Sequence, residues 1–292
     1  MPISVRALAA AIEPFAGQVY FAPECHRGYT ALGFGPSPST SNGVQMPDGA
    51  AYFCSRGSAL GQAPGEVIAA AFAVFNPAVV VPACSYGWGL TDARSITRVR
   101  TDGAVAQLCR VLGESPAGVD RAVELLARAT AGLSLAGKPL FAGLLAQQLS
   151  GDPLTAAWQL ADRLREYRGD VHINAWTSAG FDGVEIGLLT EAHQGLPPRS
   201  YIRTRAWSDA DLDAGEQRLS ARGLLSDGAI TDAGRAARET IEAVTDAGCA
   251  PIADNLGEEC DELIALVGPW SAALVAAGGF PGSATDLVAG RS

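Results

Sequence analysis

The stretch Glu166-Tyr-Arg-Gly-Asp-Val-His-Ile-Asn-Ala-Trp176 combines Arg, Asp, His and Trp in a run whose pattern indicates a buried helix. Residues three or four positions apart share a helix face, and four side chains here follow that spacing: Arg165, Arg168, His172 and Trp176. Beside this face runs an apolar stripe made of Leu154, Trp158, Ala161, Val171 and Ala175. Charged groups at the edge of such a stripe need partners, because unpaired buried charge is costly. The stretch therefore predicts the wall of a pocket.

The apolar residues up to position 195 recur with a helical period, and no run alternates as a strand would. Helices are expected at 3–12, 18–32, 66–75, 91–112, 116–131, 138–149, 153–176 and 182–194. Residues 33–48 are rich in Gly, Pro and Ser and predict a loop, either a lid over a site or an insertion. Residues 85–89 predict a turn. We expect residues 1–197 to form one helical domain that binds a ligand or substrate.

The pattern changes after residues 195–199. Ser208 with Asp211 three residues on predicts a capped helix start, and Gly223 predicts its end. Residues 224–225 and 229–231 predict two very short strands around an Asp227-Gly228 turn, and helices follow at 232–249 and 260–277. Helix, small hairpin and helix indicate a winged-helix-like unit over residues 198–292. The predicted fold class is all-α, with a single short β-hairpin.

The net charge of −10 and a pI of about 4.8 disfavour nucleic-acid binding, which depends on clustered positive charge. The winged-helix-like unit is itself acidic: residues 201–249 hold 6 Arg against 9 Asp and Glu, a net charge of −3. The helix before the hairpin, which would enter the major groove, carries Asp209, Asp211, Asp213 and Glu216. Arg199, Arg203 and Arg205 are the residues that favour DNA binding. Otherwise the unit packs on the helical domain, forms a homodimer or binds a partner subunit.

Other sequence features narrow the class of protein. The six cysteines are scattered without a C-x-x-C pair, and the histidines lack metal-ligand spacing, so we expect no metal. No nucleotide-binding glycine motif occurs, so no cofactor is expected. Neither a signal peptide nor a membrane span is indicated, and we expect a cytoplasmic protein. Frequent Ala, Gly and Val with a single Lys suggest a GC-rich genome, such as that of an actinobacterium.

Several short elements along the chain are similar to those of one known family. They are Tyr20-Phe-Ala-Pro-Glu24, Tyr52-Phe53 with Arg56, Leu60-Gly61 with Pro64, Phe72 with Phe75 and Pro77, Arg168-Gly-Asp170 with His172, Asp182-Gly183 with Glu185, and Ile241-Glu242 with Thr245-Asp246 and Leu256-Gly257. On these residues the chain resembles a largely uncharacterised actinobacterial family with a C-terminal helix-turn-helix. The resemblance implies a helical domain followed by a winged-helix-like unit, and it implies no particular activity. Residues 33–48 are longer than the family pattern.

The candidate catalytic residues are His172, Asp170, Glu24 and Glu185. A histidine tuned by a carboxylate and an arginine is a common acid–base group. Asp170 is only two positions from His172 and so lies off its helix face, which weakens a direct pair. The alternative is a polar network that only closes a helical core.

The candidate substrate-binding residues are His26, Tyr29, Tyr52, Arg56, Arg168 and Trp176. Arg56 lies in Ser-Arg-Gly-Ser, where an arginine can hold an anion through two parallel hydrogen bonds. We expect the segments around 24–29, 56 and 168–176 to converge, because buried polar groups need mutual partners.

These features favour a cofactor-free protein that binds a small, anionic molecule. An enzyme or enzyme subunit of specialised metabolism is the first hypothesis, with His172 as the acid–base group and Arg56 and Arg168 holding the anion. The alternatives are a ligand-sensing winged-helix transcriptional regulator that uses the same pocket, and a protein-interaction module.

Overall fold

The computed structural model describes residues 5–282. Its helices are α1 (Val5–Gly17), α2 (Pro23–Ala31), α3 (Gly49–Gly57), α4 (Gly65–Ala71), α5 (Pro77–Leu90), α6 (Ala93–Leu112), α7 (Val119–Thr130), α8 (Pro139–Leu145), α9 (Pro153–Ser178), α10 (Gly183–Gln194), α11 (Asp209–Ala221), α12 (Asp232–Leu256) and α13 (Cys260–Ala276). Two hairpins complete the described part, β1 (Thr40–Ser41) with β2 (Val44–Gln45), and β3 (Leu225–Ser226) with β4 (Ala229–Ile230). The predicted all-α class is confirmed.

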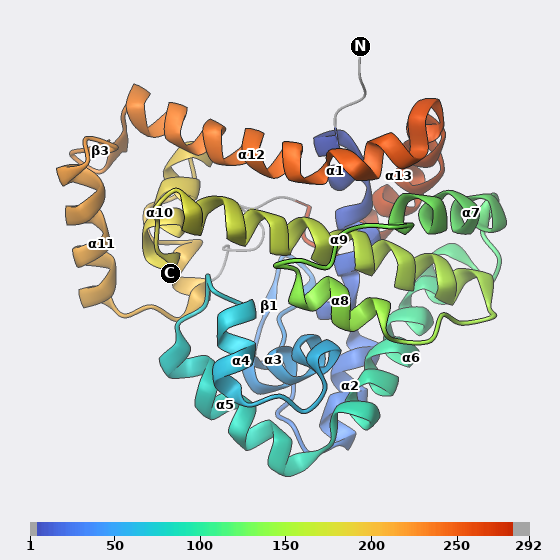
Figure 1. The fold of residues 1–292 in the computed structure, drawn as a ribbon. Helices are drawn as coiled ribbons and strands as arrows, with labels where there is room; N and C mark the ends of the chain where they lie inside the picture. The colour runs from blue at the N-terminus through green and yellow to red at the C-terminus, as the bar shows by residue number, and fades with distance from the viewer. Residues whose placement is uncertain (1–4, 283–292) are drawn as a thin grey trace.

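Helix α9 lies at the centre of the helical body, with α12 lying along it in Figure 1. It starts where Asp152 accepts a hydrogen bond from the Thr155 backbone N–H, and Pro153 occupies the first turn. Its side chains are buried on several faces, because α1, α7, α8 and α12 all pack against it. The indole N–H of Trp158 donates to the Ala16 carbonyl at 3.1 Å and ties α9 to α1. The main hydrophobic core therefore surrounds the helix that the sequence pattern singled out.

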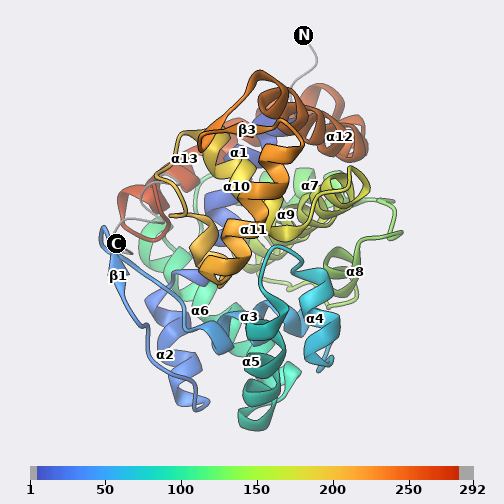
Figure 2. The same cartoon turned by 90° about the vertical axis from the view of Figure 1, so that its left-hand side faces the viewer.

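We call α10, α11, the β3–β4 hairpin and the start of α12 the helix-turn-helix unit, and Figure 2 shows α10 and α11 side by side. A second hydrophobic core lies among these elements, the end of α9 and the segment before α11: Trp176, Leu188, Ile202, Leu212, Leu219, Leu225 and Ile241. Helix α13 packs on α1 and contributes to the main core instead. The boundary expected between two domains, at residues 197 and 198, therefore does not separate the two hydrophobic cores.

The hairpin of the helix-turn-helix unit lies within one residue of its predicted position. Leu225 pairs with Ile230 and Ser226 with Ala229, across a turn in which Asp227 and Gly228 both have positive φ, 49° and 77°. Asp-Gly favours this turn because both residues tolerate the left-handed region. The predicted capping box of α11 is also present, since Ser208 and Asp211 each accept a hydrogen bond from the other's backbone N–H.

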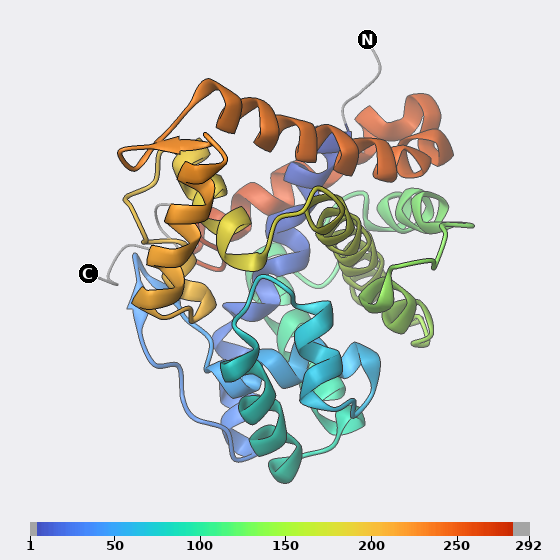
Figure 3. The same ribbon diagram turned by 60° about the vertical axis from the view of Figure 1, so that its left-hand side comes forward.

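Four local predictions need correction. Residues 85–89, expected to form a turn, lie inside α5, where Gly87 packs closely against Cys54 and Phe34. Residues 33–48 contain the β1–β2 hairpin around Asn42 and Gly43, so the chain has a second short hairpin. The expected helix at 18–32 is interrupted, because Pro23 starts α2 after a short 3-10 turn. Helix α12 continues past residue 249 to Leu256 and so reaches from the second core into the main core (Figure 3).

Candidate functional site

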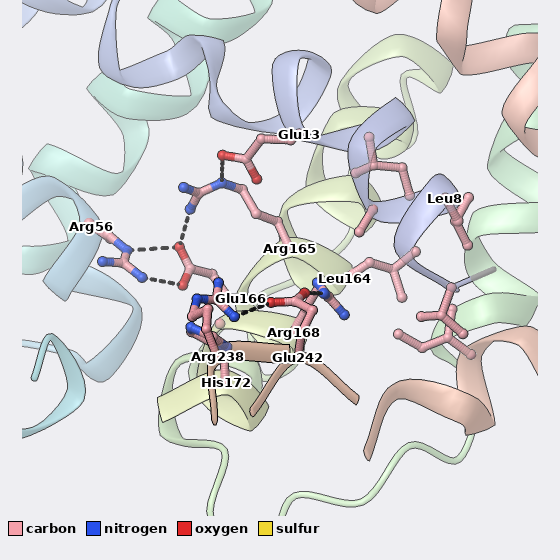
Figure 4. Close-up of a pocket in the computed structure, with 15 residues that line it drawn as sticks. Leu8, Glu13, Arg56, Leu164, Arg165, Glu166, Arg168, His172, Arg238 and Glu242 are labelled. Carbon is pink, nitrogen blue, oxygen red and sulfur yellow. Dashed lines mark hydrogen bonds and ion pairs between the residues drawn. The ribbon is translucent and has the colours of Figure 1, made fainter. Parts of the chain in front are cut away.

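A cavity of about 290 Å³ lies where α1, α3, α9 and α12 meet. Its apolar wall comes from α1, α9 and α12: Val5, Leu8, Ala9, Ile12, Leu164 and Ile252. Its polar end carries four arginines, three glutamates and one histidine: Arg56, Arg165, Arg168, Arg238, Glu13, Glu166, Glu242 and His172. Figure 4 shows Leu8 on the side away from Arg56 and Glu166, with Leu164 between Leu8 and the charged side chains. The cavity is therefore amphipathic.

Glu166 is the buried anchor of the polar end. Arg56 donates to both of its carboxylate oxygens, at 2.8 and 2.6 Å, and Arg165 Nη1 donates to Oε1 at 2.9 Å (Figure 4). Tyr20 adds a weaker hydrogen bond to Oε1 at 3.3 Å. Burial opposes ionisation here, but Arg56 and Arg165 lower the pKa of Glu166 to about 2. Glu166 is thus charged near neutral pH and has its lone pairs occupied.

A second charged group connects α9 to α12. Arg168 forms ion pairs with Glu242 and, at 2.9 Å, with Asp246. Arg238 Nη1 donates to Glu242 at 2.8 Å, and its Nε donates to the Thr190 hydroxyl of α10 at 3.1 Å. Arg238, a residue of α12, therefore lines the cavity and also hydrogen-bonds to α10 of the helix-turn-helix unit.

His172 lines the cavity and bonds to α12 through one ring nitrogen. Its Nδ1 lies 3.0 Å from the Thr245 hydroxyl oxygen. Burial, followed by the nearby Arg238, lowers the pKa of His172 to about 4 despite the opposing charge of Glu242. The imidazole is therefore neutral at pH 7, so the acid–base role predicted for His172 would start from the neutral base and not from the charged acid.

Asp170 lies apart from His172 and outside the cavity lining. It is 2 % exposed and accepts a hydrogen bond from the Phe141 backbone N–H at 3.0 Å, near the start of α8. The off-face spacing seen in the sequence thus places it against α8, and it stabilises that helix start rather than orienting His172.

Asp170→Asn is expected to stabilise the protein at high pH. Burial raises the pKa of Asp170 from 3.8 to about 7, so folding favours the protonated form and stability falls as pH rises between these values. Asparagine keeps a carbonyl acceptor for Phe141 and carries no charge. Chemical denaturation should show that the variant's free energy of unfolding exceeds that of the wild type by on the order of 1–4 kcal/mol at pH 8. This difference should shrink towards pH 4. A loss of stability at pH 8, or a gain independent of pH, would contradict this.

The segment around Glu24 does not reach the cavity, contrary to the expected convergence. Glu24 pairs with Arg110 at 2.8 Å, on α6. His26 is buried with both ring nitrogens bonded, to Gln45 at 3.2 Å and to the Tyr20 carbonyl at 3.0 Å. The buried ring of Tyr29 packs edge-on against Phe34. Glu24 and His26 thus find polar partners close by, and α2 packs mainly on α6 instead of on the cavity.

Three further candidates also lie outside the cavity lining. Tyr52 lies just behind it, with its hydroxyl 3.5 Å from Arg56 Nη1 and its ring against Tyr20. Trp176 is buried in the second core. Glu185 completes the capping box that starts α10 and faces Arg218 and Arg222. Of the ten candidate residues, the structure brings Arg56, Arg168 and His172 together in the lining.

Five charged lining residues were not among the candidate site residues: Glu13, Arg165, Glu166, Arg238 and Glu242. Arg238 and Glu242 are four positions apart on a predicted helix, a spacing that signals an ion pair but not a cavity. Within residues 5–282, no group of three His, Cys, Asp or Glu side chains is close enough to hold a metal ion. Over the same residues, no helix has the length and apolarity needed to cross a membrane.

The fold and the cavity define a class: an all-helical protein in which a helix-turn-helix unit is joined to a helical body. The chain belongs to a helix-turn-helix family, whose model matches residues 5–281. Comparisons with curated proteins and with solved structures gave no match.

Proposed function

We propose that the protein binds a small amphipathic molecule in the cavity between α1, α3, α9 and α12. The observation that carries this proposal is that aliphatic side chains and a cluster of arginines line the same cavity. Its volume of about 290 Å³ is close to the lower end of small-molecule sites, roughly 300–1,000 Å³. An apolar body on the aliphatic side and a polar group at the arginine end fit this lining.

The balance of donors and acceptors supports a carboxylate as the polar group. Glu166 and Glu242 are each bonded to two arginines. In contrast, no acceptor for Nη2 of Arg165 or Nη2 of Arg238 is found among residues 5–282. An anionic oxygen supplied by a ligand would satisfy these donors, and charge-assisted hydrogen bonds are the strong ones.

Ala9→Phe should abolish binding by filling the cavity without removing a charge. Octanoate, an alkyl carboxylate, serves as the probe, titrated by calorimetry into wild-type protein and each variant. Ala9 lines the cavity, whereas its neighbour Ala10 is exposed on the same helix. Ala10→Phe is therefore the matched control and should bind as the wild type does. Equal affinities for the two variants, or no binding to the wild type, would contradict the proposal.

A ligand-sensing transcriptional regulator is the second candidate, favoured by family membership and by Arg238. This residue lines the cavity and bonds to Thr190 of α10, so a bound ligand would act on a helix of the helix-turn-helix unit. An enzyme using His172 for acid–base chemistry has less support, because its neutral imidazole has no carboxylate partner within residues 5–282.

The charges of the helix-turn-helix unit argue against binding of DNA backbone phosphates in this conformation. Two of its arginines have acidic partners: Arg199 pairs with Asp213 and Glu216, and Arg203 with Asp209. Arg205 stacks on the rings of Phe75 and Tyr201 instead of facing solvent freely. The acidic residues at the start of α11 remain exposed or half-buried.

A gel-shift titration with the DNA upstream of its own gene tests the regulator, at 50 and 150 mM salt with and without octanoate. We expect no shift at 150 mM salt, since phosphate contacts require free positive charge. A salt-resistant, sequence-specific shift that octanoate changes would favour the regulator and refute the charge argument.

A further inference from the structure

The hydrogen bonds around His172 fix which of its ring nitrogens carries the proton. The Thr245 hydroxyl has one hydrogen, and it donates that hydrogen to the Ile241 carbonyl of its own helix at 2.8 Å. The same oxygen lies 3.0 Å from His172 Nδ1, so it accepts a hydrogen bond from Nδ1–H. In the neutral imidazole, Nε2 is then a hydrogen-bond acceptor.

This acceptor is open to a ligand. His172 lines the cavity, and no partner for its Nε2 occurs among the described residues. Nε2 is also not one of the fully buried polar atoms without a partner in that part of the chain. It therefore keeps some solvent-accessible surface. Arg168 and Arg238 lie close enough to act on the charge of the ring. The polar end of the cavity thus offers a ligand one hydrogen-bond acceptor, His172 Nε2, near the guanidinium donors of Arg165 and Arg238 that have no acceptor within residues 5–282.

We propose that the ligand is a 2-hydroxy carboxylic acid with an aliphatic tail, its hydroxyl donating to His172 Nε2 and its carboxylate facing the arginines. This inference rests on the proposed function and specifies its ligand class. A neutral hydroxyl fits better than an ammonium donor, because the positive charges of Arg168 and Arg238 act on the ring of His172. A hydroxyl next to the carboxylate suits an acceptor that lies among those arginines, while the tail contacts Leu8, Ile12 and Leu164.

Three probes that differ at one position test the donor: octanoate, 2-hydroxyoctanoate in both enantiomers, and 2-methoxyoctanoate. The methoxy group keeps the oxygen but removes the hydrogen. Calorimetry at pH 7 should show one enantiomer of 2-hydroxyoctanoate binding three- to tenfold tighter than octanoate, about the effect of one neutral hydrogen bond. 2-Methoxyoctanoate should show no such gain. The hydroxyl preference should stay constant from pH 6 to 8, because His172 remains neutral there.

Two variants assign the preference to His172. His172→Leu should bind octanoate but lose the preference for the hydroxyl. Thr245→Val removes the group that fixes the proton on Nδ1, and it should reduce the preference while leaving octanoate affinity unchanged. Thr245→Val also keeps the test decisive if His172→Leu fails to fold, which circular dichroism will show.

The outcomes separate the two proposals. Equal affinity for octanoate and both 2-hydroxyoctanoate enantiomers would overturn the hydroxy-acid inference and leave the carboxylate site intact. A preference that persists in both variants would overturn the role of His172. Binding of none of the probes by the wild type would overturn both proposals.

Discussion

Replacing Glu166 by glutamine is expected to destabilise the protein by about 3–5 kcal/mol, the range for removing one partner of a buried ion pair. The Glu166 side chain is 2 % exposed, and its partner Arg56 is 12 % exposed. Without the carboxylate, Arg56 would have no ion-pair partner within residues 5–282, and Arg165 would keep only the partly exposed Glu13. Urea denaturation with circular dichroism measures the loss.

Glu13→Gln is the matched control, because Glu13 also pairs with Arg165 but its side chain is 44 % exposed. It should cost less than about 1 kcal/mol, as expected for a solvent-screened pair. Similar losses in the two variants would show that burial of Glu166 does not matter.

The Glu166 variant should also change the pH dependence of stability. The folded-state pKa of Glu166, about 2, lies below its ordinary value of 4.5. Its stabilising effect is therefore complete above pH 4.5 and is lost as pH falls towards 2. The difference between wild type and Glu166→Gln should shrink over that interval.

Replacing Arg238 by leucine is expected to weaken octanoate binding about 10- to 150-fold, which corresponds to one lost charged hydrogen bond of roughly 1.5–3 kcal/mol. Arg238 lines the cavity and is only 11 % exposed, and its Nη2 has no acceptor within residues 5–282. Glu242 keeps Arg168 as a partner in the variant, so the fold should survive.

Arg235→Leu is the matched control, one turn earlier on α12. Arg235 is exposed and does not line the cavity. Its replacement should leave octanoate affinity unchanged, as measured by calorimetry. If Arg238→Leu binds like Arg235→Leu, the carboxylate does not lie at Arg238.

The parts of the fold that could be predicted are those with local causes. The turn at Asp227 and Gly228 and the capping box at Ser208 depend on a few neighbouring residues, and both were predicted. The return of α13 to α1 and the passage of α12 through both cores depend on tertiary packing. Helical periodicity reveals which face of a helix is buried but not against which partner.

The same limit explains which parts of the site could be predicted from the sequence. Arg168 and His172 were recognised because they lie beside an apolar helix face, and Arg56 because its Ser-Arg-Gly-Ser run can hold an anion. The partner of Arg56 is Glu166, and the partner of Arg168 is Glu242, on other helices far along the chain. Glu24 and His26 carry the same chemistry in the sequence, yet neighbouring α6 and β2 already supply their partners. Residue type identified polar clusters, and only the packing of helices decides which of them share a cavity.

Hydrogen–deuterium exchange of the wild-type protein, with and without saturating octanoate, tests the central claim most directly. If the cavity holds the ligand, exchange should slow in residues 5–13 of α1, 164–172 of α9 and 238–252 of α12, which line it from three sides. Residues 77–90 of α5 lie outside the lining and should be unchanged. Unchanged exchange in all three lining segments, or protection confined to another region, would contradict the account.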